Sequence, residues 1–192
     1  MIDPLGLDSI LVALGALLES RGHRFELAVV GGGSLVRLDL ARRATRDLAV
    51  VALVNGDEYT TAQPLPADLV EAVSDVGTAF GLASNWLNNG PTELLDFGLP
   101  AGFEGRAERR EYGSLVLHIA SRLDQIHLKL YASVDQGPRS KHVADLTLLL
   151  PTRDELLAAA RWTRQHDPSE GYREELVQAL QHFGVMDADE LV

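Results

Sequence analysis

The sequence predicts an α/β fold of the α+β kind, in which a small mixed β-sheet is flanked by helices and followed by a helical C-terminal region. Two apolar runs, "FELAVVGGG" and "DLAVVALV", stand on either side of a short arginine-containing segment. Runs of Val, Leu and Ala without alternation suit strands that are buried on both faces of a sheet. After residue 120, Ser or Thr twice precedes an acidic residue by three positions, which is a helix-capping pattern. The first part of the chain therefore indicates a sheet, and the last third indicates helices.

Composition and charge limit the classes of function. The chain has 192 residues, no cysteine and a formal net charge of −11. An acidic surface repels a phosphate backbone, so we expect no binding of duplex DNA, and any nucleic-acid contact has to come from a local basic patch. The absence of cysteine removes disulfides and zinc–thiolate sites. We expect a cytoplasmic protein without a membrane segment, because no apolar stretch approaches the length of a spanning helix and no basic segment precedes the first apolar run.

In the first half, each expected element has a local signal. Asp8 is expected to cap a helix that ends at Gly22, with its apolar residues on one stripe: Ile10, Leu11, Leu14, Leu17 and Leu18. Strands are expected over Val29–Gly33 and Leu48–Leu53, joined by "SLVRLDLARR" as a short helix or turn. Pro66 is expected in the first turn of a further helix. Residues 81–105 are rich in Gly, Asn and Pro, which predicts a structured loop with short helical turns.

The second half predicts one more strand and then helices. The strand is expected over Leu115–Ile119, and capping boxes at Ser121 and Thr152 are expected to start two helices, with another helix in "PRSKHVADLTLLL" between them. The last helix has three starting signals, which are Asp167 as N-cap, Pro168 and Glu170. We expect an α/β core over residues 1–120 and a helical region over 121–192 packed on it, or one single domain.

The glycines after the first apolar run allow three functional interpretations. A dinucleotide-binding fingerprint needs Gly or Ala at position 36, where this chain has Val36. It also needs an acidic residue at the end of a second strand, which this chain lacks at the expected distance. A P-loop needs Gly-Lys-Ser/Thr, which is missing. In the third interpretation, Gly33 and Ser34 turn a strand into a helix so that backbone N–H groups and the hydroxyl face a phosphate. The structural alternative is that the glycines only allow close packing of the strand and the helix.

Several segments together resemble a known superfamily. The stretch "VVGGGSLVRL…RATRDLAV" resembles the nucleotidyltransferase-fold superfamily, in particular its bacterial branch of AbiEii toxins and MNT-like proteins. In that branch a Gly-Gly or Gly-Ser turn is followed by an Arg-x-Thr-x-Asp-x-Asp strand. The segments "SNWLNN" and "LHIASRLDQIHLKLYAS…RSKHVADL" are similar to later motifs of the same branch. The resemblance covers roughly residues 9–150 and implies a mixed sheet of nucleotidyltransferase type.

The resemblance implies a nucleotide site with one departure from the family pattern. In the family, the turn binds an NTP, and paired aspartates hold Mg²⁺; acids at i and i+2 of a strand reach one cation because they share a face. Carried over, the nucleotide-binding residues are Gly32, Gly33, Ser34, Thr45 and Arg46. The resemblance implies that Asp47 is a metal ligand and a catalytic residue, and Ala49 stands where the second aspartate belongs. The family usually has a third acid on the next strand, where His118 is the one polar residue in mid-strand of this chain. Asp39 or Asp57 compensates for the missing acids only if the fold brings it inward.

Further residues are candidates with structural alternatives. Lys129 and Asp145 match catalytic positions of the family's helical motif, and His142 stands where the family often has Asp; the alternative for Lys129 is a solvated helix face. A basic cluster surrounds the glycines and suits a triphosphate, an RNA end or an acidic partner, or else a solvated face: Arg37, Arg42, Arg43 and Arg46. His118 and His127 are expected to be core or surface histidines rather than metal ligands. Trp86 and Trp162 are expected to be packing anchors rather than base-stacking platforms.

Two hypotheses of function follow. The first is an enzyme that transfers a nucleotide from an NTP to a protein or RNA hydroxyl, as in toxin–antitoxin systems, with Mg²⁺ as cofactor. The second is a non-catalytic module of the same fold that binds a nucleotide or a cognate protein partner. Ala49 favours the second hypothesis, because one carboxylate holds a divalent cation less well than two.

Overall fold

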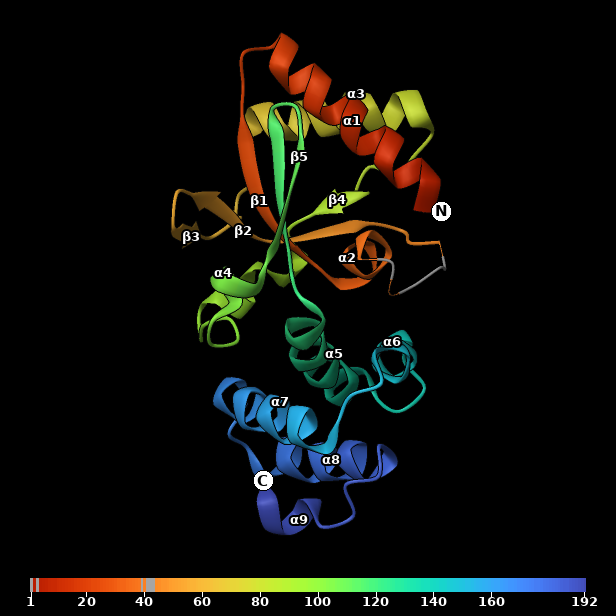
Figure 1. Ribbon diagram of the computed structural model, residues 1–192, viewed down its shortest axis with the longest axis vertical. Helices are drawn as coiled ribbons and strands as arrows, with labels where there is room; N and C mark the ends of the chain where they lie inside the picture. Colours follow the sequence, from red (N-terminus) through yellow and green to blue (C-terminus); the bar gives the residue numbers. More distant parts are fainter. Residues whose placement is uncertain (1, 3, 39, 41–43) are drawn as a thin grey trace. The chain divides into compact units, whose positions relative to one another are not determined.

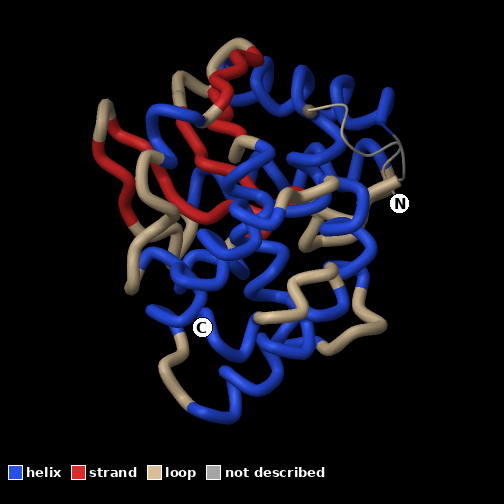
Figure 2. The backbone as a smooth tube through the Cα atoms, turned by 60° about the horizontal axis from the view of Figure 1, so that its bottom comes forward, coloured by secondary structure: helices blue, strands red, loops and turns tan. Residues whose placement is uncertain are grey.

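The computed structural model describes residues 2, 4–38, 40 and 44–192. It confirms the α/β class, with a six-stranded mixed sheet flanked by helices and a helical C-terminal region. The chain divides into two compact units, Met1–Ser121 and Arg122–Val192. The named strands all belong to the first unit, and they are drawn in red in Figure 2.

The first unit contains both strands and helices (Figure 1). Its helices are α1 (Pro4–Ser20), α2 (Gly31–Arg37), α3 (Ala67–Phe80), the 3₁₀ helix η1 (Gly90–Leu95) and α4 (Phe103–Arg106). Its strands are β1 (Phe25–Val30), β2 (Leu48–Asn55), β3 (Glu58–Thr60), β4 (Leu87–Asn88), β5 (Glu108–Tyr112) and β6 (Leu115–Ile119).

The sheet has the order β3-β2-β1-β6-β5, with β4 also paired to β2. β1 lies antiparallel to β2 and parallel to β6, while β4 lies parallel to β2. The register places Val30 opposite Ala49, and Ala49 opposite Asn88 of β4. Consequently the end of β1, the start of β2 and β4 lie side by side, next to the first residues of α2.

Helices α1 and α3 lie side by side in Figure 1 and share the main apolar core with the sheet. Side chains of α1, α3 and the strands, such as Leu14, Val73 and Leu117, belong to one buried cluster. Trp86 joins this core with no exposed surface and donates from Nε1 to the carbonyl of Val73 at 2.9 Å. This position agrees with the packing interpretation of Trp86.

Helix α1 begins earlier than the sequence indicated. The expected N-cap Asp8 lies in the second turn, because the helix starts at Pro4, where a proline is well tolerated. The predicted stop is confirmed: Gly22 has φ +74°, its N–H donates to the carbonyl of Glu19, and the N–H of His23 donates to that of Leu18. These two bonds form a Schellman motif, which satisfies carbonyls at the helix end.

The expected strand Val29–Gly33 is wrong in its second half. β1 ends at Val30, and the three glycines form the first turn of α2. Gly31 has φ +80°, which a residue without a Cβ adopts without strain, so the chain passes from strand to helix with no intervening loop. Ser34 therefore lies inside α2 rather than at a turn.

Three strands lack an apolar signal and were not expected. β5 has the sequence ERREY and lies at the edge of the sheet, where charged side chains are common. β3 and β4 have three and two residues, too few for a pattern. Residues 81–105 contain β4 and η1 as well as the expected short turns, and Pro66 is the N-cap of α3 rather than its first residue.

The second unit is helical. Its helices are α5 (Arg122–Gln136), α6 (Lys141–Leu149), α7 (Arg153–His166), α8 (Glu170–His182) and α9 (Ala188–Leu191). The expected starts after Ser121 and Thr152 are confirmed, and Thr152 and Glu155 form both bonds of a capping box. The expected start of the last long helix is wrong: its N-cap is Ser169, while Asp167 accepts a hydrogen bond from the N–H of Ser169 at 2.9 Å. Asp167 thus shapes the connection between α7 and α8.

Within the described part of the chain, no helix combines the length and the apolar composition that crossing a bilayer requires.

Candidate functional site

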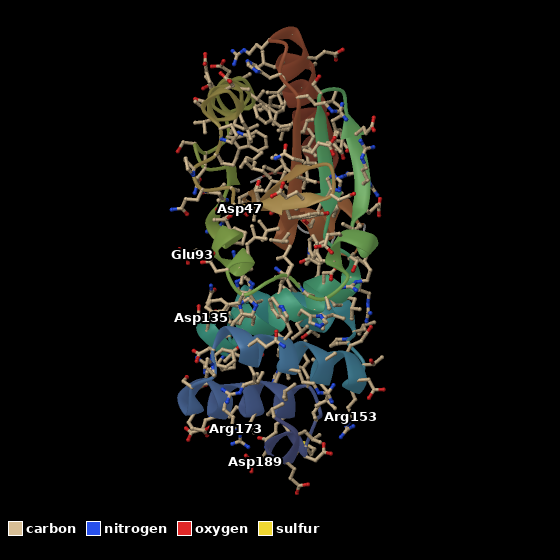
Figure 3. All side chains as sticks on the ribbon, turned by 90° about the vertical axis from the view of Figure 1, so that its left-hand side faces the viewer. Asp47, Glu93, Asp135, Arg153, Arg173 and Asp189 are labelled. Atoms are coloured by element: carbon tan, nitrogen blue, oxygen red, sulfur yellow. The ribbon has the colours of Figure 1, made fainter. Side chains whose placement is uncertain are left out.

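Asp47 lies immediately before β2, and it is labelled in Figure 3. Its side chain is half-buried, and Oδ2 accepts a hydrogen bond of 3.3 Å from Nδ2 of Asn88. Its backbone carbonyl accepts a hydrogen bond of 3.0 Å from the hydroxyl of Thr45. The carboxylate is therefore placed by the start of β2 and oriented by a residue of β4.

A row of side chains crosses the sheet beside Asp47. Leu87, Leu48, Val29 and Ile119 belong to the apolar core on one face of the sheet. Since side chains alternate along strands, the residues that follow them face the other side: Asn88, Ala49, Val30 and Ala120. Strand pairing brings these four together as neighbours, because Ala49 pairs with Asn88 and with Val30, and the N–H of Ala120 donates to the carbonyl of Val29. The row contains no carboxylate.

The glycines pack closely against the start of β2. A Cβ built on Gly33 lies 2.9 Å from Cδ1 of Leu48 and 3.0 Å from the carbonyl oxygen of Asp47. One built on Gly31 lies 3.8 Å from Cβ of Ala49. The structure therefore brings the glycines and Asp47 together, as both the phosphate interpretation and the packing interpretation expected, and the contact at Gly33 gives the packing role a direct cause.

Ser34 and Thr45 have specific places in this region. Ser34 is fully buried, and its hydroxyl makes no hydrogen bond within the described residues. Thr45 is 3% exposed, and its backbone pairs with Ile2 through two hydrogen bonds. Gly32 is half-buried in the first turn of α2. In this conformation the two hydroxyls face the protein interior.

The basic cluster divides into different environments. Arg37 contacts Asp8 of α1, with Nη1 and Oδ2 2.9 Å apart and only 12% of its side chain exposed. Arg46 is exposed and directly precedes Asp47. Arg42 and Arg43 lie outside the described residues, as does Asp39. Of the two arginines of this cluster that the structure describes, Arg46 is the exposed one.

The other candidates for a third acid do not join Asp47. Asp57 lies in the turn between β2 and β3, at the opposite end of the eight-residue strand. His118 lies 2.9 Å from Glu26 of β1, between Nε2 and Oε2. This hydrogen bond is the main cause that lowers the pKa of Glu26 below its usual value, helped by Arg24 and Arg109. His118 and Glu26 form a polar cluster with Arg109 of the edge strand β5, whose Nη2 lies 3.9 Å from Oε1 of Glu26.

Lys129 and Asp145 form a buried ion pair within the second unit. Nζ and Oδ2 are 2.7 Å apart, and the side chains are 5% and 1% exposed. Lys129 comes from α5 and Asp145 from α6, so the pair joins two helices. The solvated helix face considered for Lys129 is wrong, because the charged end is almost fully buried.

His127 belongs to an aromatic cluster of the second unit. His127 is 7% exposed, its Nδ1 lies 2.8 Å from the carbonyl of Leu123, and its ring meets Trp162 at a centroid distance of 5.9 Å. Trp162 also packs on His166 with centroids 4.2 Å apart. Burial raises the pKa of the nearby Tyr172. These rings form a core, in agreement with the packing interpretation of His127 and Trp162.

The donor set next to Asp47 does not suit Mg²⁺. This cation prefers several oxygen ligands at octahedral positions. Asp47 brings one carboxylate, its same-face neighbour Ala49 brings a methyl group, and Asn88 directs an NH₂ group toward Asp47. Across the described residues, no group of three or more His, Asp or Glu side chains is arranged to hold a metal ion.

The sequence reasoning missed two residues that contact the candidates. Asn88 was noted only within "SNWLNN", and its contact with Asp47 depends on the unexpected strand β4. Glu26 sits in the apolar run "FELAVV", and a charge inside a buried strand was a usable signal for a cross-strand partner. Comparison of the chain with family models, with curated proteins and with solved structures finds no match.

Proposed function

We propose that this chain binds a nucleotide on a fold of nucleotidyltransferase type and does not catalyse metal-dependent nucleotide transfer. One observation carries the proposal: the same-face neighbour of Asp47 along β2 is Ala49, in a row of side chains without a carboxylate. Metal-dependent transfer uses paired acids to hold the cation that neutralises the phosphates. With a methyl group at the second position, the cation loses one of the two paired carboxylates.

The surroundings of Asp47 support a nucleotide as ligand. Gly31 and Gly33 bring the start of α2 against Ala49 and Asp47. Arg46 is exposed immediately beside Asp47 on a chain of net charge −11. A guanidinium at such a place binds a phosphate through paired N–H donors.

Titration with ATP, GTP, CTP and UTP in EDTA tests the proposal. We expect the wild type to bind at least one of them, and Arg46→Ala to weaken that binding about tenfold or more, since a charge-assisted hydrogen bond is lost. Arg21→Ala is the matched control, because Arg21 pairs with Asp75 of α3 and is also a surface arginine. Equal weakening by both variants, or no binding of any nucleotide, contradicts the proposal.

A radiolabel-transfer assay on cell lysate separates the remaining candidates. The retained Asp47, hydrogen-bonded by Asn88 and preceded by Thr45, favours transfer to a protein or RNA hydroxyl as the second candidate. Label transfer by the wild type that disappears in Asp47→Ala supports that enzyme. Absence of both binding and transfer leaves a module that binds a cognate protein partner or an RNA end.

A further inference from the structure

The side chain of Asn88 is held in one orientation. Its Oδ1 accepts a hydrogen bond of 3.1 Å from the backbone N–H of Gly90. A backbone N–H can only donate, so the oxygen of the amide has to face Gly90. The NH₂ group therefore faces the other way, where it meets Oδ2 of Asp47 and the carbonyl of Asn85, each at 3.3 Å.

This orientation places a donor where a cation has to bind. An amide NH₂ group donates hydrogen bonds and offers no ligand to a cation. It approaches Asp47 from β4, whose Asn88 pairs with Ala49, the position of the missing second acid. The same side chain thus occupies the space beside the carboxylate and supplies the positive end of a dipole to it.

We propose that the Asn88 amide replaces a divalent cation beside Asp47, so that this site works without a metal ion. The inference deepens the proposed nucleotide site, on which its biological meaning rests, by naming the group that excludes the metal. Asn88 acts as a positioning residue: it orients Asp47 through one hydrogen bond and is itself fixed by Gly90.

A single substitution is expected to convert the site. Asn88→Asp keeps an oxygen for the N–H of Gly90 and places a second oxygen about 3 Å from Oδ2 of Asp47, near the present position of Nδ2. Two carboxylates at this separation bind a hard cation well. Asn85→Asp is the matched control, because it adds the same charge three residues earlier on an exposed residue. In this variant the Asn88 side chain still donates to Asp47.

The test uses Mn²⁺ alone, measured by electron paramagnetic resonance and by the melting temperature with and without the ion. We expect Asn88→Asp to bind Mn²⁺ about tenfold or more tightly than the wild type and Asn85→Asp. If the two acids repel each other and destabilise Asn88→Asp, Mn²⁺ is expected to restore its melting temperature, since the folded state binds the ion.

Two results overturn the inference. One is Mn²⁺ binding by the wild type that Asp47→Ala abolishes, because a cation then already occupies the site. The other is an Asn88→Asp variant whose Mn²⁺ affinity and Mn²⁺-dependent melting do not exceed those of Asn85→Asp. Neither result depends on nucleotide, so a failure of the proposed function in the NTP titration is recognised separately.

Discussion

At the scale of single residues, two side chains set the chemistry around Asp47. Ala49 points to the same face of the sheet two positions later, and Asn88 is its neighbour on the adjacent strand. A methyl group cannot bind a cation, and an amide with a fixed NH₂ group donates to the carboxylate. In a site with paired acids, a metal ion neutralises the carboxylates. Here the hydrogen bond from Asn88 stabilises the carboxylate of Asp47 instead.

Glu155 provides a residue-scale prediction on pH. Arg122 donates to its two carboxylate oxygens at 2.7 and 3.2 Å, and this bond is the main cause that lowers the pKa of Glu155. A carboxyl with a lowered pKa in the folded state stabilises the fold above its unfolded pKa of about 4.3, and this stabilisation is lost as the pH falls through the folded value.

Glu155→Gln is therefore expected to be less stable than the wild type by about 1–2 kcal/mol at pH 7, with the difference shrinking between about pH 5 and pH 3. Urea unfolding at several pH values measures it. Glu174→Gln on the exposed side of α8 is the control with the same charge change. A difference that stays constant down to pH 3 would show that the carboxylate charge is not what Arg122 stabilises.

At the scale of elements, the sequence predicted a strand or a helix correctly where it has one clear apolar run or one N-cap without a competing residue nearby. The runs before Val30 and after Asp47 gave β1 and β2, and Thr152 gave the start of α7. The pattern was not informative for β5, because the charges of an edge strand face solvent on both sides of the ladder. The start of α8 was misplaced because Asp167 and Ser169 are both good N-caps, and only the chain geometry selects Ser169.

The sequence predicted the part of the candidate site that depends on local spacing along the chain. Asp47 and Ala49 follow from the i, i+2 spacing of a strand, and Gly33 follows from the close approach of α2 to that strand. The contact with Asn88 is between residues 41 positions apart and depends on a two-residue strand, which leaves no periodic signal. The burial of Ser34 depends on helix α2 starting at Gly31 rather than on the turn itself.

The pair of Lys129 and Asp145 gives a prediction for the contact between α5 and α6. Removing one partner, as in Asp145→Asn, is expected to destabilise the protein by about 3–5 kcal/mol, because the other charge stays buried. The double variant Lys129→Met with Asp145→Leu is expected to cost far less, since both charges leave together. Urea unfolding measures these differences.

The exposed pair of Arg153 and Asp187, with side chains 50% exposed, is the control in the same unit (Figure 3 labels Arg153). Asp187→Asn is expected to cost less than about 1 kcal/mol. If Asp145→Asn is no more destabilising than Asp187→Asn, or if the double variant is as unstable as the single one, burial of the charges does not explain the pair.

At the scale of the whole molecule, the candidate site around Asp47 belongs to an acidic chain. The net charge of −11 raises the cost of bringing a triphosphate close to any lone carboxylate. A metal-dependent site overcomes this cost with Mg²⁺, whereas a metal-independent site has to rely on arginine and backbone N–H donors. The dependence of nucleotide affinity on Mg²⁺ therefore distinguishes the two kinds of site.

The most direct measurement is calorimetric titration of the wild type and Asn88→Asp with the NTP that binds, with and without Mg²⁺. Mg²⁺ is expected to leave the affinity of the wild type unchanged and to raise that of Asn88→Asp about tenfold, because this substitution removes the NH₂ donor that excludes the cation and supplies a second carboxylate. An increase of that size in the wild type, abolished by Asp47→Ala, would contradict the claim that this site works without a metal ion.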